Sequence, residues 1–359
     1  MLVGGEGTRL RPLTFETPKP MVPIMNVPFL ERTLVRLREA GITDVILPAG
    51  YLPEAITSYF GDGSALGMKV TYVIEETPLG TAGALKNVER HITGTFFVLN
   101  GDVLTSLDLR AMLAFHRRHG GIGTLHAIRV DDQSAFGCIL RGADGRIARF
   151  VEKPPRDDAP TNEINAGTYL LERDVLDAIP AGRAVSVERE TFPALIGGTR
   201  PLYSYVTDDY WVDLGRPEAY LGAHREIFDG KMPLALGGSV SGVNGPGAAS
   251  VPPGSIVGPA FIGASVTVAG GATVGPYAVL GDGCRIDAGA IVRDSLLWDR
   301  VHVGARAEID GAIIASRAKV GIDVTISDGA VIGHDVEIPN RTHVAADARL
   351  AATDLAPAG

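Results

Sequence analysis

The sequence has few cysteines, no long apolar run and no surplus of basic residues. Its two cysteines, Cys138 and Cys284, lie far apart without a metal-binding spacing, so we expect buried, reduced thiols. No apolar stretch approaches the ~18 residues that cross a bilayer. No signal peptide is recognisable, so we expect a cytosolic protein without a membrane partner. The net charge of −9 argues against a nucleic-acid partner, because phosphate backbones need clustered Lys and Arg.

A chain of 359 residues is long for one hydrophobic core, and its two halves follow different patterns. Residues 1–230 alternate short apolar runs with helical periodicity, which predicts an α/β, Rossmann-like domain with a mainly parallel sheet. One predicted helix carries Leu30, Leu34 and Leu37 and ends near Gly41. The other predicted elements are strands at Thr43–Leu47, Val70–Ile74, Phe96–Leu99 and Thr124–Val130 and a helix at Asp108–His119.

The second half has a six-residue period. After a Gly-, Ser-, Pro- and Ala-rich linker over residues 231–254, aliphatic residues recur at Ile256, Ile262, Val268, Val274, Leu280, Ile286 and Val292. A small or apolar residue follows each of them four positions later. The phase slips by one at Leu297 and again at Ile314. Hexapeptide periodicity predicts a parallel β-helix over residues 255–345, with one short strand per side of a triangular coil and a C-terminal tail over 346–359.

The first residues form a glycine-rich segment followed by cations. Gly4, Gly5 and Gly7 allow backbone N–H groups to approach a phosphate chain closely. Thr8 and Arg9 then supply a hydroxyl donor and a permanent positive charge, and Lys19 in Pro18-Lys19-Pro20 adds a second cation. A glycine-rich loop alone is also typical of an ordinary tight turn, but the longer pattern is far more specific.

Two aspartates follow predicted strands. Asp102 comes after Phe96–Leu99, and Asp213 ends the short run Trp211–Asp213. In open α/β sheets, ligands bind at the carboxyl ends of strands, and two carboxylates suit a hard cation such as Mg²⁺. A single aspartate at such a place can instead be a turn or helix N-cap residue.

Several motifs together resemble those of the sugar nucleotidyltransferase family. Besides the N-terminal segment they are Pro78-Leu79-Gly80-Thr81-Ala82-Gly83, Asn100-Gly101-Asp102, Phe150-Val151-Glu152-Lys153-Pro154, Ile164-Asn165-Ala166-Gly167 and Trp211-Val212-Asp213-Leu214-Gly215. With the hexapeptide repeats they cover nearly the whole chain. The resemblance implies a left-handed β-helix and transfer of a nucleoside monophosphate from a nucleoside triphosphate to a sugar 1-phosphate, with release of pyrophosphate. The combination is most similar to members that make GDP-mannose from GTP and mannose 1-phosphate; thymidylyl or uridylyl transfer to glucose 1-phosphate is the alternative.

The resemblance also assigns roles to individual residues. Arg9, Lys19, Asp102 and Asp213 are the implied catalytic residues, and Asp102 and Asp213 are the implied Mg²⁺ ligands. The implied nucleotide-binding residues are Leu2, Gly4, Gly5, Gly7, Thr8, Arg9, Pro78, Gly80 and Thr81. The implied sugar-phosphate-binding residues are Gly137, Glu152, Lys153 and Asn165.

The charge of the substrates indicates the mechanism. A phosphate monoester has a second pKa of about 6 and is mostly dianionic at neutral pH, so its attacking oxygen needs no general base. Its oxygen attacks the α-phosphorus of the triphosphate in line. The protein has to bring two polyanions together and neutralise the leaving pyrophosphate, a task that suits Mg²⁺, Arg9 and Lys19.

Two other functions remain open at this stage. A non-catalytic, nucleotide-sugar-sensing relative is expected to lack the loop cations or the carboxylates, which this sequence retains. Only three residues precede the glycines, however, whereas the first strand of a family member is longer and lies in mid-sheet. An acyltransferase would use a histidine of the β-helix as a base, and His302, His334 and His343 lie there. We instead expect the β-helix to serve packing and assembly into a homo-oligomer.

Overall fold

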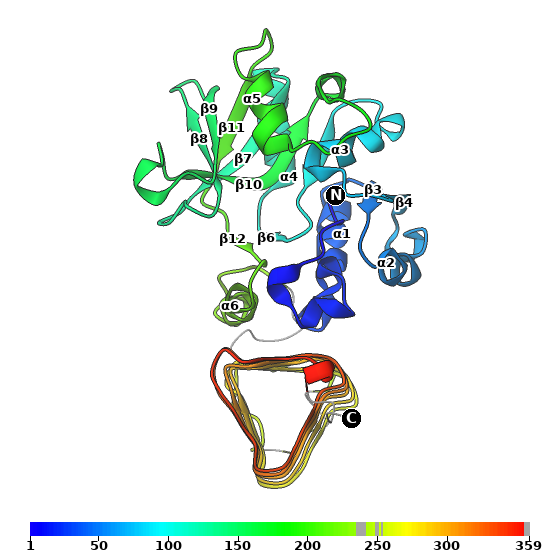
Figure 1. Cartoon of the computed structure of the whole chain (residues 1–359), viewed down its shortest axis with the longest axis vertical. Coiled ribbons are helices and arrows are strands. Elements are labelled where there is room, and N and C mark those ends of the chain that lie inside the picture. The colour runs from blue at the N-terminus through cyan, green and yellow to red at the C-terminus, as the bar shows by residue number, and fades with distance from the viewer. Residues whose placement is uncertain (235–241, 248–250, 253, 355–359) are drawn as a thin grey trace. The chain divides into compact units, whose positions relative to one another are not determined.

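The computed structural model describes residues 1–234, 242–247, 251–252 and 254–354 (Figure 1). By packing, these residues form two compact units. The first comprises Met1–Gly5 and Thr33–Trp211, and the second comprises Glu6–Arg32 and the described residues from Val212 onward. Residues 235–241, 248–250 and 253 of the predicted linker, and 355–359 of the predicted tail, lie outside the described residues. None of the described helices is long and apolar enough to cross a membrane.

The first unit is built on a six-stranded sheet with the order β11-β7-β10-β8-β9, in which β5 also pairs with β10. β5 and β7 both run antiparallel to β10, and β11 runs parallel to β7. The predicted sheet is present, and β10 and the β8–β9 hairpin are antiparallel additions to it. The strands are β5 (Phe96–Leu99), β7 (Gly123–Arg129), β8 (Gly137–Arg141), β9 (Ile147–Glu152), β10 (Glu163–Leu171) and β11 (Leu202–Val206).

The remaining elements of this half agree with the periodicity of the sequence. The four predicted strands correspond to β3 (Asp44–Ala49), β4 (Lys69–Ile74), β5 and β7, with β3 parallel to β4. The two predicted helices are α1 (Phe29–Glu39) and α4 (Leu109–His119), and the Asp108 carboxylate caps α4 by accepting from the N–H groups of Arg110 and Ala111. The other elements are α2 (Pro53–Phe60), α3 (Gly80–Asn87), β6 (Val103–Thr105), α5 (Phe192–Leu195) and β12 (Trp211–Asp213).

The chain begins beside β5. The Leu2 N–H donates to the Leu99 carbonyl at 2.9 Å, and Leu2 forms an isolated parallel bridge with Asn100. The Met1 ammonium donates to the Ile46 carbonyl of β3 at 2.8 Å. Residues 1 and 2 therefore occupy the mid-sheet position that is expected of a first strand.

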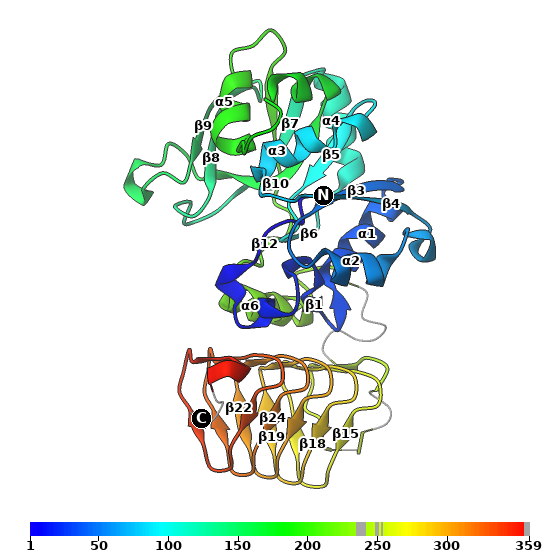
Figure 2. The ribbon, with the colours of Figure 1, turned by 45° about the vertical axis from the view of Figure 1, so that its right-hand side comes forward.

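The second unit contains a parallel β-solenoid, seen end-on as a triangle in Figure 1 and from the side in Figure 2. Its three sides are the sheets β13-β14-β17-β20-β23-β26-β29 (sheet F), β15-β18-β21-β24-β27 (sheet H) and β16-β19-β22-β25-β28 (sheet G). The strands of sheet F are Val243–Asn244, Ala260–Ile262, Ala278–Leu280, Leu296–Leu297, Ile313–Ile314, Val331–Ile332 and Arg349–Leu350. Those of sheet H are Thr267–Val268, Arg285–Ile286, His302–Val303, Lys319–Val320 and Glu337–Ile338. Those of sheet G are Thr273–Val274, Ile291–Arg293, Glu308–Asp310, Thr325–Ile326 and His343–Val344.

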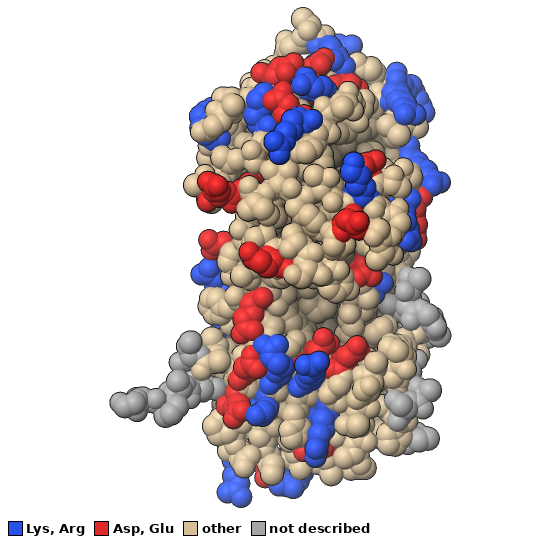
Figure 3. Space-filling view, turned by 90° about the vertical axis from the view of Figure 1, so that its right-hand side faces the viewer, with Lys and Arg blue, Asp and Glu red and all other residues tan. Residues whose placement is uncertain are grey.

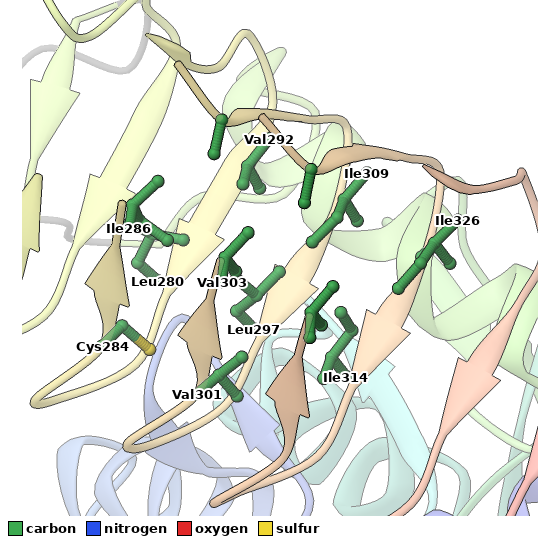
Figure 4. Close-up of a cluster of buried hydrophobic side chains, with 14 of the residues drawn as sticks. Leu280, Cys284, Ile286, Val292, Leu297, Val301, Val303, Ile309, Ile314 and Ile326 are labelled. Carbon is green, nitrogen blue, oxygen red and sulfur yellow. The ribbon is translucent and has the colours of Figure 1, made fainter. Parts of the chain in front are cut away.

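The predicted aliphatic residues fill the interior of the solenoid (Figure 4). Leu280, Leu297 and Ile314 stack in one file and are at most 1% exposed. Cys284 is a buried free thiol at a corner, and burial raises its pKa to about 12. Cys138 is likewise buried and free in the first unit. Both cysteines are thus buried thiols, as expected.

The two phase slips correspond to shortened corners. Val279 pairs with Leu296 and Leu296 with Ile313, spacings of 17 residues, whereas Ala260 pairs with Ala278 at a spacing of 18. The missing residue falls between sheets G and F, before Leu296 and before Ile313. At the first short corner the Ser295 hydroxyl donates to the Arg293 carbonyl at 2.6 Å and accepts the Ala312 N–H at 3.1 Å. The buried hydroxyl thus satisfies backbone groups of two successive coils.

The outward-facing residues differ between the three sides. On sheets G and H they are mostly polar or charged, for example Arg285, Lys319 and Glu308. On sheet F they are apolar and at most 8% exposed: Phe261, Val279, Leu296, Ile313 and Val331. Helix α6 (Pro217–Phe228) and the segment 6–32 of the same unit cover this side (Figures 1 and 2). That segment contains η1 (Thr8–Leu10), η2 (Leu13–Phe15), η3 (Lys19–Met21), β1 (Pro23–Ile24) and β2 (Val27–Pro28).

Charged side chains on the exposed sides pair between successive coils. Arg306 and Arg317 each bind an aspartate one coil further on, Asp323 at 2.7 Å and Asp335 at 2.6 Å. Figure 3 shows such Lys and Arg side chains next to Asp and Glu over the solenoid, in the lower part of the view. Exposed ion pairs of this kind contribute little to stability, so the stability of the solenoid comes mainly from its apolar interior.

We expect Ile314→Ala to lower the free energy of unfolding by about 3 kcal/mol, because it leaves a cavity in a file that is closed on all sides. Urea denaturation followed by tryptophan fluorescence measures the loss. The matched control is Ile322→Ala, since Ile322 is 41% exposed and its truncation should cost well under about 1 kcal/mol. If the two variants lost the same free energy of unfolding, the interior file would not be the main source of the solenoid's stability.

Candidate active site

The cations predicted to bind phosphate lie in the signature segment, defined here as residues 6–21 with the turns η1, η2 and η3. Gly7 has φ +63°, and a Cβ added there would lie 3.2 Å from Lys19 Cβ and 3.1 Å from the Thr14 methyl group. The Thr14 hydroxyl donates to the Gly7 carbonyl at 2.9 Å. The segment therefore folds back on itself and holds η1, which carries Arg9, close to η3, which carries Lys19.

Asp213 brings the two cations together within the second unit. Its Oδ1 lies 3.9 Å from Lys19 Nζ and its Oδ2 lies 3.9 Å from Arg9 Nη2. The Lys19 side chain is 12% exposed, whereas that of Arg9 is 54% exposed. The structure thus joins three of the four predicted catalytic residues, with a buried ammonium and an open guanidinium on one carboxylate.

The motif Trp211-Val212-Asp213-Leu214-Gly215 ends in a glycine because there is no room for a side chain beside Arg9 and Asp213. A Cβ on this glycine would fall 2.5 Å from Arg9 Nη2 and 2.7 Å from Asp213 Oδ1. The missing side chain leaves the room that the guanidinium needs beside the carboxylate. A larger residue at this position would separate Arg9 from Asp213.

Asp102 belongs to the first unit, in the turn between β5 and β6. The Gly101 N–H donates to the Leu2 carbonyl at 2.9 Å, and a Cβ on Gly101 would meet that oxygen at 2.5 Å. The Asn100 N–H donates to the Gly167 carbonyl at 2.8 Å, and Gly167 has φ +73°. Three of the predicted motifs, around Leu2, Asp102 and Asn165, therefore meet at the end of β5.

The predicted nucleotide-binding residues fall into two places in the first unit and one in the second. Leu2, Gly4 and Gly5 lie at the start of the chain, and a Cβ on Gly5 would meet nothing within 4 Å. Gly7, Thr8 and Arg9 belong to the signature segment of the second unit. Pro78, Gly80 and Thr81 lie at the N-terminus of α3, where Gly80 has φ +68° and its Cβ position lies 2.7 Å from the Val185 carbonyl oxygen.

The predicted sugar-phosphate residues are adjacent in the sheet. Gly137 of β8 pairs with Glu152 of β9, and Cys138 pairs with Ile164, the neighbour of Asn165 in β10. A Cβ on Gly137 would lie 2.6 Å from Glu152 Oε2 and 2.7 Å from Phe150 Cζ, so a larger residue would displace the carboxylate and crowd the ring. Lys153 follows directly, with φ +50° and its Nζ 3.9 Å from Glu152 Oε1. The structure thus brings all four residues to one edge of strands β8, β9 and β10.

Burial affects two of these residues differently, since it fixes the Asn165 amide and changes the protonation of Glu152. The Asn165 amide donates to the Tyr169 hydroxyl at 2.8 Å, and its carbonyl oxygen accepts the Gly167 N–H at 3.2 Å. Tyr169 is fully buried, and its ring packs edge-on against Phe192 at 4.9 Å. Burial, followed by the nearby Glu188 charge, raises the pKa of Glu152 above its usual range. Asn165 is therefore fixed in orientation, and Glu152 protonates more readily than an ordinary glutamate.

Glu188 is a residue that the sequence analysis missed. Its Oε2 accepts from the Thr81 hydroxyl at 2.9 Å and from the Ser186 hydroxyl at 2.8 Å, while Thr81 Oγ1 accepts the Val187 N–H at 2.8 Å. Glu188 therefore connects Thr81 with the neighbourhood of Glu152. The sequence around it indicates only a helix N-cap, Ser186, whose hydroxyl accepts the Arg189 N–H.

The solenoid histidines do not form a common site. His302 pairs with Asp287 at 2.8 Å on sheet H, His343 is exposed on sheet G, and His334 is buried against the signature segment. Over the described part of the chain, no group of three or more His, Cys, Asp or Glu side chains could hold a metal ion. The metal site predicted from the sequence has two carboxylates, Asp102 and Asp213. Mg²⁺ fits such a set because it is usually held by one or two carboxylates together with water and substrate phosphates.

Comparison with known proteins places both halves of the chain. A family model described as nucleotidyl transferase matches residues 1–230, and one described as GMPPB C-terminal domain matches residues 256–355. The chain is 45% identical to mannose-1-phosphate guanylyltransferase of Mycobacterium tuberculosis over 300 residues, which cover 81% of this chain and 82% of that protein. It is 34% identical to mannose-1-phosphate guanylyltransferase 1 of Arabidopsis thaliana, over 96% of this chain and 92% of that protein.

One further relative is named for a different activity, and one similar solved structure is a complex with a ligand. The UTP–glucose-1-phosphate uridylyltransferase of Synechocystis is 33% identical over 88% of this chain and 87% of that protein. Among solved structures, HddC from Yersinia pseudotuberculosis complexed with GMP-PN is 32% identical, with a TM-score of 0.53, over 62% of this chain and 95% of that one.

A pH dependence follows from the way helix α6 holds the segment 6–32. His224 Nδ1–H donates to the Tyr220 carbonyl at 2.9 Å, and its Nε2 accepts the Met25 N–H at 3.2 Å, so the ring is neutral. Burial lowers its pKa from 6.5 to about 4. The unfolded chain therefore binds a proton that the folded protein does not between pH 6.5 and about 4.

We expect this histidine to remove about 2 kcal/mol of folding free energy on going from pH 7.5 to pH 5. Urea denaturation at the two pH values measures the loss. His224→Gln keeps one donor and one acceptor without titrating and should show a correspondingly smaller loss, whereas the control His343→Gln should behave as the parent. An identical loss in the parent and in His224→Gln would refute the assignment.

Proposed function

Because the chain belongs to the nucleotidyl transferase family, we propose that it transfers GMP from GTP to mannose 1-phosphate, giving GDP-mannose and pyrophosphate. The observation that carries the proposal is the set Arg9–Asp213–Lys19, in which two cations share one carboxylate behind a glycine-rich loop. Two relatives named for this activity, similar over 81% and 96% of the chain, support the choice of guanine and mannose.

The cations neutralise charge that moves during the reaction. The sugar phosphate attacks the α-phosphorus, the bond to the β-phosphate oxygen breaks, and the negative charge passes to the pyrophosphate. Lys19, which is largely buried, offers its ammonium in a site of reduced solvent screening, and Arg9 presents a planar guanidinium to phosphate oxygens. Asp213 keeps both groups oriented before the substrates arrive, so little reorganisation is needed when charge develops.

The β8–β9–β10 edge is assigned to the sugar phosphate. Lys153 would meet the phosphate, and Glu152 would accept sugar hydroxyls as long as it is ionised. Asn165, held by Tyr169 and Gly167, offers a fixed amide to another hydroxyl. Hydroxyl-accepting groups with fixed orientation discriminate well between sugars, because a missing or misplaced hydroxyl leaves a buried group unpaired.

We assign the nucleotide to Leu2, Gly4, Gly5, Gly7, Thr8 and Arg9 and to the turn Pro78–Thr81, where Glu188 holds the Thr81 hydroxyl. Asp102 and Asp213 are the proposed Mg²⁺ ligands. When bound, Mg²⁺ would act as a Lewis acid toward phosphate oxygens. A cytosolic enzyme that forms a homo-oligomer through its solenoid completes the proposal.

We expect pyrophosphate release with GTP and mannose 1-phosphate to exceed that of every other pair in a matrix of GTP, ATP, UTP and dTTP against mannose, glucose and galactose 1-phosphates. Coupled phosphate detection measures the rates, and chromatography identifies GDP-mannose. A preference for UTP with glucose 1-phosphate would move the chain to the activity named in the Synechocystis relative. If no pair releases pyrophosphate, the proposal that the chain is a nucleotidyltransferase is wrong.

Asp213→Asn should lower kcat by at least about 100-fold, because the neutral amide neither holds Lys19 and Arg9 in place nor serves as an anionic metal ligand. Added EDTA should abolish the parent activity, and excess Mg²⁺ should restore it. The matched control is Asp229→Asn, since Asp229 is exposed and its carboxylate accepts the Tyr277 hydroxyl at 2.9 Å, away from Arg9 and Lys19. Near-parental turnover of a folded Asp213→Asn protein would contradict the role proposed for Asp213.

A further inference from the structure

The signature segment rests on the solenoid, not only on other parts of the nucleotidyltransferase sequence. Both belong to the same compact unit. The outward row of sheet F is apolar from Phe261 to Val331 and ends with a single charged residue, Arg349 of β29. This change of chemistry occurs where the signature segment meets the last coils.

Arg349 contacts the backbone carbonyls of Arg9, the proposed catalytic arginine, and of Arg11. Its Nη1 donates to the Arg11 carbonyl oxygen at 2.9 Å and lies 3.4 Å from the carbonyl oxygen of Arg9. Both carbonyls lie at the C-terminal end of η1, which spans Thr8–Leu10. Arg349 therefore binds the turn that carries the Arg9 side chain.

Two other residues of the last coils hold the middle of the segment. His334 Nε2 lies 3.2 Å from the Leu13 carbonyl oxygen and 3.2 Å from Thr17 Oγ1, and the residue is only 6% exposed. Arg317 binds Glu16 at 2.9 Å while it also binds Asp335 of the next coil at 2.6 Å. Pro12 packs at the same place, because a Cβ on Gly333 would lie 3.2 Å from the Pro12 Cβ.

A second group of contacts anchors the C-terminal part of the segment 6–32. The Asn26 amide donates to the Leu280 carbonyl of β17 at 2.7 Å. Trp298, whose ring packs against His334 at 5.4 Å, donates from its indole N–H to the Tyr220 hydroxyl at 3.2 Å, and that hydroxyl donates to the Pro23 carbonyl at 2.5 Å. The coils from β17 to β29 thus contact the segment at several places between Arg9 and Asn26.

From these contacts we infer that the solenoid is part of the catalytic apparatus, with Arg349 and His334 as positioning residues that act through the signature segment. The inference rests on the proposed function, since it assigns to Arg9 and Lys19 the phosphate contacts described above. The tight packing of Gly7 against Thr14 and Lys19 transmits a displacement of η1 to η3. Loss of Arg349 therefore misplaces both cations without removing either of them.

The kinetic test uses the full chain. Arg349→Met should lower kcat for pyrophosphate release about 10- to 100-fold, the size expected when a catalytic group is misplaced by about 1 Å. The KM for mannose 1-phosphate should not change, because the β8–β9–β10 edge is untouched. Arg349→Lys, which keeps a donor for the Arg11 carbonyl, should recover part of the loss. His334→Phe, which keeps the ring beside Trp298, should act in the same direction as Arg349→Met.

The matched control is Arg285→Met. Arg285 is also an outward-facing arginine of a solenoid strand, but it binds Asp287 on sheet H. This variant should keep the parental kcat and KM. A loss of activity in Arg285→Met equal to that in Arg349→Met would mean that the effect is a general one of solenoid charge, and would overturn the inference.

A second measurement does not depend on activity. Amide hydrogen exchange of peptides covering residues 6–21 should be faster in Arg349→Met than in the parent and unchanged in Arg285→Met. Faster exchange with parental turnover, or parental exchange with lowered turnover, would each overturn the inference, since positioning requires both effects. If the parent protein releases no pyrophosphate, the proposed function fails, while the exchange result still decides whether Arg349 holds the segment.

Discussion

The seating of residues 6–32 on the apolar side of the solenoid is the constraint on which the rest of the second unit depends. Sheet F presents Val279, Leu296 and Ile313 outward, and these side chains are buried only because helix α6 and this segment cover them. Leaving that row in water would cost roughly 25 cal/mol for each Å² of apolar surface. The hydrophobic contact therefore places the segment, and the hydrogen bonds of Asn26, His334 and Arg349 then set its register on the coils.

Glycines decide how closely the proposed catalytic and substrate-binding groups can approach one another. Gly7 permits the fold of the signature segment against Lys19, Gly215 leaves room for the Arg9 guanidinium beside Asp213, and Gly137 leaves room for the Glu152 carboxylate. In each case a Cβ would lie within about 3 Å of the group that the motif serves. The glycines of these short motifs are therefore needed to make room for charged side chains. This explains why the motifs combine glycine with Arg, Asp or Glu.

Much of this could be predicted from the sequence, because periodicity and motif chemistry are local properties. The strands β3, β4, β5 and β7, the helices α1 and α4 and the interior file of the solenoid follow from spacing alone. The antiparallel direction of strand β10 could not be predicted, since a buried apolar run such as Glu163–Leu171 has the same sequence pattern in a parallel and in an antiparallel strand. Glu188, Arg349 and His334 could not be found either, because their partners lie 107, 338 and 321 residues away. The outward row of sheet F was readable as an apolar stripe, but only the structure shows what covers it.

The register between the segment 6–32 and the solenoid also limits how the repeat can evolve. Coils of a parallel solenoid stack at about 4.8 Å, and a repeat protein generally tolerates gain or loss of a unit because each coil contacts only its neighbours. Here Asn26 is tied to β17 and the carbonyl of Arg11 to β29, with β20, β23 and β26 between them. Duplication or deletion of one of these coils would leave a well-formed solenoid whose anchor points no longer match the segment. The number of coils between β17 and β29 is therefore constrained by the segment 6–32, whereas coils added beyond β29 would be free to vary.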